Sequence, residues 1–269
     1  MEKHALYHMT WKEIEEVFKS DPVVIIPMGS TEQQGIHSLT GDYLAAEAIA
    51  KRVAEKAGAY YVPVIPFGCS EYFRCFPGTI SLRPSTVEAV ITDVVESLTE
   101  HGITKIFFIN GHAGNTPTIE DVARKLRREK GIVCFSIDLW QGLTPEAKKE
   151  IYGEGPDSSG HGGDPLTSVM LYLYPEDMRM DLLNPVENIK EYKGVPVNGL
   201  KKGMVKGVPF NLYMDMIDVT KQGVMGNPFA SSAERGEKIV NHLVDACCEM
   251  VRIIKENDTP IELWIYLVL

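Results

Sequence analysis

The stretch VVIIPMG, residues 23–29, is a continuous apolar run that fits a strand buried on both faces of a sheet. KIFFIN at 105–110 has the same character, and GIVCFSID at 131–138 predicts a further strand. YYVPVIPFG at 60–68 also predicts a strand, although its prolines limit the length because proline cannot donate to a ladder. Strands of this kind are typical of parallel sheets, in which crossover helices cover both faces.

Segments with the spacing of amphipathic helices separate these strands. Thr10 and Glu13 form a predicted capping box before the first helix, and Gly58 is a predicted C-cap for the second. The helices are expected at residues 11–18, 42–57, 85–101, 117–130, 165–174 and 231–256. Regular alternation of strands and helices indicates right-handed crossovers. The sequence therefore predicts an α/β fold, a mostly parallel β-sheet with helices on both faces.

The second half of the chain is less regular. Residues 152–163, YGEGPDSSGHGG, predict a loop, and residues 184–230 carry many glycines and prolines with little periodicity. The sequence contains no internal repeat and no linker that would divide it. We therefore expect one α/β domain over residues 1–258, followed by an apolar C-terminal tail at 259–269.

Composition excludes several classes of partner. The formal net charge of −10 over 269 residues argues against nucleic acid, because binding phosphate backbones requires clustered Lys and Arg. No apolar stretch approaches the roughly 20 residues of a membrane span. The five cysteines are odd in number and form no C-x-x-C pair, which is typical of reduced thiols in a cytoplasmic protein. The expected partner is a small-molecule substrate.

Polar residues that can bind a metal follow two of the predicted strands directly. GSTEQQGIHSLTGD at 29–42 contains Glu32 and Asp42, and NGHAGN at 110–115 contains His112. Ligands of open parallel sheets bind beyond the carboxyl ends of the strands, so these three side chains are expected to converge there. Two carboxylates and an imidazole suit a divalent metal ion, Zn²⁺ or Mn²⁺. Such an ion lowers the pKa of its water to roughly 7 and polarises a carbonyl.

Each of these residues also has a simpler interpretation. Asp42 precedes a predicted helix and could be its N-cap, and Glu32 could be a solvated loop carboxylate. His112 lies between Gly111 and Gly114, which let the backbone come close to a ligand. The occurrence of all three by chance at adjoining strand ends is less expected than that of any one of them.

His161 lies in the glycine-rich segment GHGGD, residues 160–164. A histidine in a polar loop of this kind is a candidate general acid or base. The alternative is a surface histidine without a role in chemistry. Tyr72 is expected among the residues that line the pocket.

Several segments together resemble the creatininase (creatinine amidohydrolase) family. They are IPMGSTEQQGIH (26–37), FPGTISL (76–82), INGHAGN (109–115), HGGDPLTS (161–168) and GVMGNPFASSAERG (223–236). The resemblance spans nearly the whole chain, in the family's order, and implies an α/β fold, a centre of one or two metals and hydrolysis of small amides. It also implies a homo-oligomer, a hexamer. By position, Glu32, Asp42 and His112 match the ligands of one metal, and His161 matches the family's catalytic loop histidine.

The sequence departs from the family's pattern at the second metal. The family has a histidine ligand where this chain has Gln34, and acidic residues where it has Gly114 and Leu166. Gln34 could still ligate through its amide oxygen, and His37 or Asp164 could substitute. We assign His37, Tyr72 and Asp164 to the substrate pocket.

The leading hypothesis is a metal-dependent hydrolase of a small cyclic or amide substrate that uses metal-activated water. Ring-opening C–C hydrolysis of an oxidised inositol or another cyclic ketone fits the altered ligand set about as well. A non-catalytic metabolite-binding protein on the same scaffold is the second class of hypothesis, and a structural module is the third. Metal content would separate the enzyme from a decayed scaffold.

Overall fold

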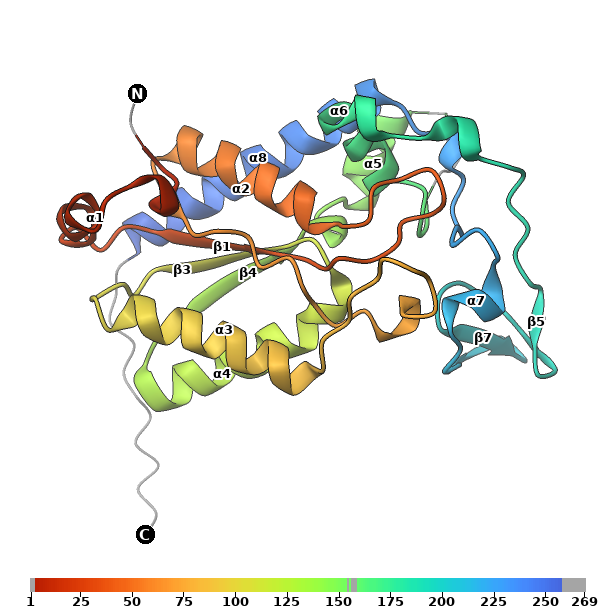
Figure 1. Cartoon of the computed structure of the whole chain (residues 1–269), viewed down its shortest axis with the longest axis horizontal. Coiled ribbons are helices and arrows are strands. Elements are labelled where there is room, and N and C mark those ends of the chain that lie inside the picture. The colour runs from red at the N-terminus through yellow and green to blue at the C-terminus, as the bar shows by residue number, and fades with distance from the viewer. Residues whose placement is uncertain (1–2, 154, 156–158, 258–269) are drawn as a thin grey trace, which may run out of the picture.

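The computed structural model describes residues 3–153, 155 and 159–257. A sheet of four parallel strands runs through its centre in the order β2-β1-β3-β4 (Figure 1). The strands are β1 (Val24–Met28), β2 (Tyr60–Tyr61), β3 (Ile106–Asn110) and β4 (Cys134–Asp138). The predicted α/β class and the single domain are confirmed. The apolar tail expected at 259–269 lies outside the described residues.

The strands expected at 131–138 and 60–68 are shorter than the sequence suggested: the first begins only at Cys134, and the second ends at Tyr61. Only Tyr60 and Tyr61 pair regularly in the segment 60–68, and Ile65 adds an isolated bridge to Met28. The intervening Pro63 lacks the N–H that a ladder needs, which explains the early end of β2.

Helices cover both faces of the sheet, as expected (Figure 1). The helices α2 (Tyr43–Ala57), α6 (Leu166–Leu173) and α8 (Ala233–Glu256) cover one face, and α3 (Pro84–Thr99) and α4 (Thr116–Lys130) cover the other. Successive strand side chains alternate between the two cores that result. Phe107 packs with the first group, whereas Ile106 and Phe108 pack with the second. This alternation is the reason why the strands are apolar at every position.

The sheet and the helices that cover it form the body of the molecule. Two further helices lie at its margins. α1 (Trp11–Phe18) begins at the predicted capping box of Thr10 and Glu13. α5 (Pro145–Tyr152) was not expected, although Thr144 caps it and proline opens it in the way that helices commonly start. Short 3-10 helices occur at Leu6–His8, Glu71–Phe73, Ala113–Asn115, Leu139–Gln141, Pro175–Asp177, Met180–Leu182 and Pro228–Ala230.

The irregular segment contains a small lobe, which we define as residues 189–219. It holds two antiparallel hairpins and one short helix: β5 (Glu191–Tyr192) with β6 (Val195–Pro196), β7 (Lys202–Val205) with β8 (Val208–Asn211), and α7 (Met216–Val219). Each hairpin turns at a Lys-Gly pair with positive φ at both residues, as two-residue hairpin loops require. Buried residues of the lobe pack against Tyr72 and Phe73 of the body. The lobe therefore lies beside the ends of the strands (Figure 1).

None of the helices in the described ranges has the length and apolar content that crossing a membrane requires.

Candidate functional site

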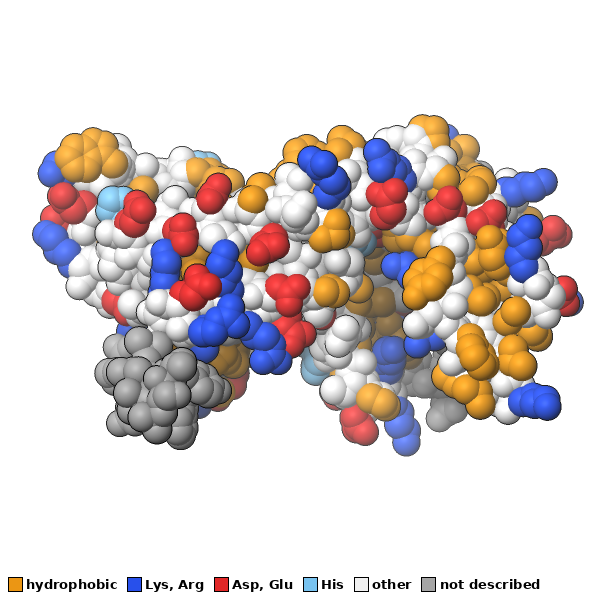
Figure 2. All heavy atoms as spheres, turned by 90° about the horizontal axis from the view of Figure 1, so that it is seen from below, with side chains coloured by type: hydrophobic (Ala, Val, Ile, Leu, Met, Phe, Trp, Pro, Cys, Tyr) orange, Lys and Arg blue, Asp and Glu red, His pale blue; other side chains and the backbone are white. Residues whose placement is uncertain are grey.

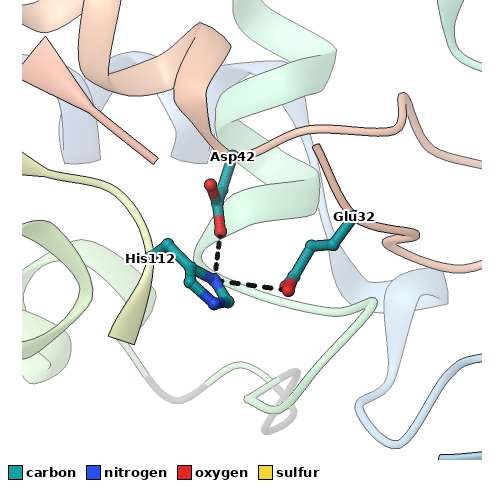
Figure 3. A group of neighbouring side chains, drawn as sticks. All are labelled: Glu32, Asp42 and His112. Atoms are coloured by element: carbon teal, nitrogen blue, oxygen red, sulfur yellow. Dashed lines mark hydrogen bonds and ion pairs between the residues drawn. The ribbon is translucent and has the colours of Figure 1, made fainter. Parts of the chain in front are cut away.

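The side chains of Glu32, Asp42 and His112 meet beyond the carboxyl ends of β1 and β3. The parallel register pairs Met28 with Asn110, so the loops that follow these residues start side by side. Nδ1 of His112 lies 2.9 Å from Oδ2 of Asp42 and 3.3 Å from Oε2 of Glu32 (Figure 3). One ligand atom from each residue lies within 4.8 Å of the others, which is the arrangement that a single ion needs.

Asp42 does not cap the helix that follows it. It stands at the N-cap position of α2, but its side chain makes no capping hydrogen bond. Oδ1 instead accepts a hydrogen bond of 2.6 Å from the backbone N–H of Ser30, and Oδ2 faces His112. Glu32 is also far from a solvated loop carboxylate, since it is only 2% exposed. The simpler interpretations of both carboxylates are therefore wrong.

The tautomer of His112 fits a role as a ligand. Nε2 lies 3.0 Å from the carbonyl oxygen of Cys69, which can only accept, so Nε2 carries a proton. In the neutral ring the lone pair of Nδ1 then points at the two carboxylates. A cation or a proton between Nδ1 and the carboxylates relieves the repulsion between the lone pair and the negative charge. An acceptor such as the Cys69 carbonyl on the other ring nitrogen commonly orients a histidine ligand.

Buried charge makes this position attractive to a cation. Burial disfavours the charged imidazole, but the carboxylates of Asp42 and Glu32 outweigh it and raise the pKa of His112 well above 6.5. Burial raises the pKa of Asp42 to about 6, against the opposing effect of His112. Two buried carboxylates that face one imidazole thus leave negative charge for a divalent ion to neutralise.

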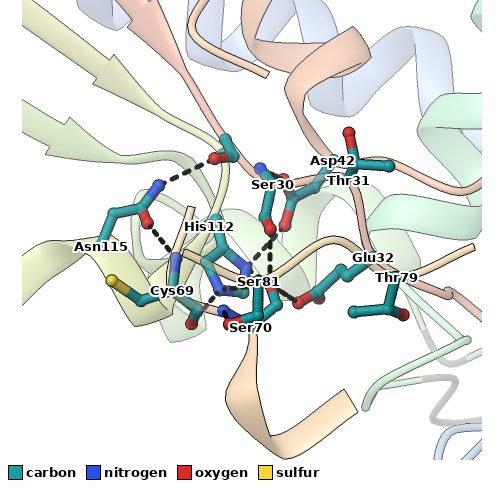
Figure 4. A network of polar contacts seen from close by, with 12 residues as sticks. Ser30, Thr31, Glu32, Asp42, Cys69, Ser70, Thr79, Ser81, His112 and Asn115 are labelled. Atoms are coloured by element: carbon teal, nitrogen blue, oxygen red, sulfur yellow. Dashed lines mark hydrogen bonds and ion pairs between the residues drawn. The ribbon is translucent and has the colours of Figure 1, made fainter. Parts of the chain in front are cut away.

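Ser70 holds Glu32 in place and is itself in contact with Ser30, and the sequence revealed neither serine. Oγ of Ser70 donates to Oε2 of Glu32 at 2.6 Å and lies 2.5 Å from Oγ of Ser30 (Figure 4). Ser70 also lies 3.2 Å from Nε2 of His112. The amide of Gln34 donates to the other oxygen, Oε1, at 2.8 Å. Both oxygens of Glu32 are therefore positioned by neutral donors.

The backbone leaves no room for a side chain at Gly114. A Cβ there would lie 2.3 Å from the carbonyl oxygen of Cys69 and 2.4 Å from Nε2 of His112. An acidic residue at this position would therefore require the loop to shift.

His161 lies in the wall of the same cavity. Its ring stacks on Phe73 with centroids 4.2 Å apart, and Nε2 lies 2.9 Å from the backbone oxygen and 3.0 Å from the side-chain nitrogen of Gln33. The oxygen accepts when Nε2 is protonated, and the amide donates when it is not, so either state has a partner. Burial lowers the pKa of His161, which favours the neutral ring. His161 is therefore not a freely exposed loop histidine. The sequence did not indicate its contacts with Phe73 and Gln33.

The remaining predicted site residues have different surroundings. Tyr72 lines the cavity, its hydroxyl has no hydrogen-bond partner among the residues that the structure describes, and burial raises its pKa to about 12. Asp164 also lines the cavity, but its oxygens accept from Ser231 at 2.6 Å and Arg235 at 2.8 Å. His37 is buried with Nε2 3.2 Å from Oγ1 of Thr167. The structure thus brings Glu32, Asp42, His112 and His161 to one cavity and ties Asp164 and His37 to the neighbouring framework.

The cavity has the size of a small metabolite. Its volume is about 370 Å³, and the walls include the three clustered side chains, His161, Tyr72 and Trp140. The indole N–H of Trp140 donates to the backbone oxygen of Gly111 at 2.6 Å, which fixes the ring beside the loop of His112. Cavities of this volume are typical of small-molecule sites.

A family model described as "Creatininase: Creatinine amidohydrolase" matches residues 7–251. Among characterised proteins, the creatinine amidohydrolase of Pseudomonas putida is 29% identical over 262 residues, covering 91% of this chain and 94% of the relative. The mycofactocin precursor peptide peptidase of Mycolicibacterium smegmatis is 28% identical and covers 86% and 85%. The 3-dehydro-scyllo-inosose hydrolase of Thermotoga maritima is 28% identical and covers 93% and 83%.

Solved creatininase structures share the fold over most of the chain. A mutant creatininase of Zn-Zn type and a Mn creatininase each superpose with a TM-score of 0.76 at 26% identity. Each comparison covers 94% of this chain and 98% of the other.

Proposed function

The chain belongs to the creatininase (creatinine amidohydrolase) family, and from this premise we propose that its cavity hydrolyses the amide bond of a small linear or cyclic substrate. That the protein is a hydrolase follows from the family and from relatives that span most of its length. One structural observation supports the proposal above all others. Three side chains able to ligate a single ion lie in the same cavity as a histidine able to move a proton.

Glu32, Asp42 and His112 would hold the metal, through one oxygen of each carboxylate and Nδ1 of the imidazole. A divalent ion bound there supplies Lewis acidity, which polarises the substrate carbonyl and acidifies water at neutral pH. Zn²⁺ and Mn²⁺ are the proposed ions, since solved creatininases of the same fold are described with them. We propose one ion per chain, because Gln34 is neutral and Gly114 has no room for a carboxylate.

His161 would supply the proton transfer. Water adds to the carbonyl carbon, the C–N bond breaks, and the departing nitrogen needs a proton that the imidazole can deliver. A lowered pKa keeps the ring neutral before the reaction, so that it can first take the proton from water. Stacking on Phe73 holds the ring, and Gln33 provides a partner for Nε2 in both protonation states.

Tyr72 would contact the substrate from the cavity wall, whereas Asp164 and His37 would hold the loop of residues 160–164. Arg235 and Ser231 occupy the oxygens of Asp164, and Thr167 joins His37 to the backbone oxygen of Gly162. The hexamer implied by the family resemblance stays a prediction, which sedimentation of the purified protein would test.

Hydrolysis of a C–C bond in a cyclic ketone is the second candidate reaction. It is favoured by the likeness to the 3-dehydro-scyllo-inosose hydrolase of Thermotoga maritima. The side chains of Glu32, Asp42 and His112, which we call the metal-type cluster, and the proton-transferring histidine would serve this reaction too. The leaving atom would then be carbon rather than nitrogen.

The proposal is tested by metal content and turnover together. Wild type, Asp42→Ala and His112→Ala are compared with His101→Ala, an exposed histidine, on a panel of lactams, formamides and cyclic polyhydroxy ketones. We expect the first two variants to lose both the metal and the activity, and the control to keep them. Unchanged metal stoichiometry in both variants would overturn the assigned ligands, and turnover of ketones alone would favour C–C cleavage.

A further inference from the structure

Two lysines line the cavity from segments outside the metal-type cluster. Lys148 comes from α5, and Lys201 comes from the turn that precedes β7 in the lobe. The backbone oxygen of Lys201 accepts from the N–H of Leu212 at 2.8 Å, which ties this turn to the residue that follows β8. Figure 2 shows the hollow between the body and the lobe, with Lys or Arg side chains at its walls.

Neither lysine has a carboxylate partner within the described part of the chain. Some lysines elsewhere on the surface are paired, as Lys56 is with Asp245 and Lys130 with Glu96, so what distinguishes Lys148 and Lys201 is that they line the cavity. Lys201 instead lies over the ring of Tyr72, with Nζ 5.2 Å from the centroid. Both ammonium groups are therefore available to something that enters the cavity.

The acidic groups of the cavity do not supply the missing partners. Glu32 and Asp42 face His112, and Asp164 is paired with Arg235 at 2.8 Å. Glu71 lies 3.2 Å from Arg74 in an exposed pair. Glu32 and Asp42 thus share the imidazole of His112, Asp164 and Glu71 each have an arginine, and none of the four is paired with Lys148 or Lys201 among the described residues.

Unpartnered ammonium groups at a partly enclosed wall attract an anion more strongly than they would in bulk water. The net charge of −10 makes this a local exception on an acidic protein. We infer that the substrate carries a carboxylate, bound by Lys148 and Lys201, in addition to the amide that faces His112 and His161. This inference rests on the proposed hydrolase function and narrows its substrates to acidic amides and lactams.

The test compares two lactams that carry a carboxylate or a neutral carboxamide at the same carbon, and it follows the opening of the ring. The metal-loaded full chain is assayed with 5-oxoproline and 5-oxoprolinamide, as wild type, as the Lys148→Gln/Lys201→Gln double variant, and as Lys149→Gln. Lys149 is an exposed neighbour on the same helix and serves as the matched control. We expect the double variant to lower the acid-to-amide ratio of kcat/KM about 10- to 100-fold, chiefly through KM, with no change in the control. An unchanged ratio would overturn the inference.

Binding separates this inference from the hydrolase proposal when neither lactam is turned over. Glutarate and glutaramide are then titrated calorimetrically into the same three proteins, with inorganic phosphate as a third probe. A preference for glutarate that disappears only in the double variant supports carboxylate binding, whatever reaction follows. Equal affinity for glutarate and glutaramide, or tighter binding of phosphate than of glutarate, would contradict it.

Discussion

The α/β body and the lobe at residues 189–219 border the same cavity but differ in how they are stabilised. Every residue of β1 and β3 is buried, whereas every residue of β8 is exposed. The buried apolar cluster of the lobe is small, and Tyr72 and Phe73 from the body complete it. A region with few buried contacts opens at a lower free energy than a central sheet.

This difference separates two tasks. The metal-type side chains follow strands of the rigid sheet, where geometry must be held closely for chemistry. Lys201 belongs to the lobe, and Tyr72 packs with the buried cluster of the lobe, so this wall of the cavity is built on the less buried region. His161 connects both regions, because Phe73 stacks on its ring while packing with the lobe cluster.

The largest expected effect in this comparison comes from His161. Replacing it with Ala should lower turnover by roughly 10²–10⁴-fold, because general acid/base assistance is lost. Metal content should stay unchanged, since the proposed ligands Glu32, Asp42 and His112 all lie in the body. Turnover and elemental analysis of His161→Ala are measured beside His101→Ala. Full activity would remove His161 from the mechanism, and loss of the metal would make it a ligand.

A smaller effect is expected at Ser70, which supports the metal-type cluster from a loop of the body. Ser70→Ala removes the hydrogen bond to Oε2 of Glu32 and should weaken metal affinity about 10- to 100-fold. Competition with a chelator measures the change, and Ser97→Ala on the exposed side of α3 is the control. Equal affinities of Ser70→Ala and wild type would show that Glu32 is positioned without Ser70.

The smallest effect separates the stabilities of the two regions. Gly58, which ends α2, and Gly207, in the β7–β8 turn, have φ of 63° and 76°. Substitution with Ala should cost about 1 kcal/mol at either position, because a Cβ disfavours the left-handed region. We expect Gly58→Ala to lower the free energy of global unfolding in denaturant, and Gly207→Ala to lower only the local opening energy measured by hydrogen exchange. An equal global loss for both would show that the lobe unfolds with the body.

The sequence predicted the strands and helices of the body better than the hairpins of the lobe, and the reason is physical. Buried parallel strands and amphipathic helices impose periodic apolar patterns, so 23–29 and 105–110 could be recognised directly. The lobe lacks such periods because its strands are short and largely exposed. Its turns use Lys-Gly rather than the more usual Asn-Gly, so the sequence did not indicate the positive φ of Lys193 and Lys206.

The sequence by itself determined the fold class, the strand ends that carry Glu32, Asp42 and His112, and the family resemblance, because these depend on local pattern and order along the chain. Only the tertiary structure decided which way the side chains face. It turned Asp42 from its helix toward His112, brought Ser70 to Glu32, and stacked Phe73 on His161. It also placed Lys148 and Lys201 at a common cavity, where neither has a carboxylate partner among the described residues. These contacts join residues far apart in the chain, and their distances depend on packing that no local pattern records.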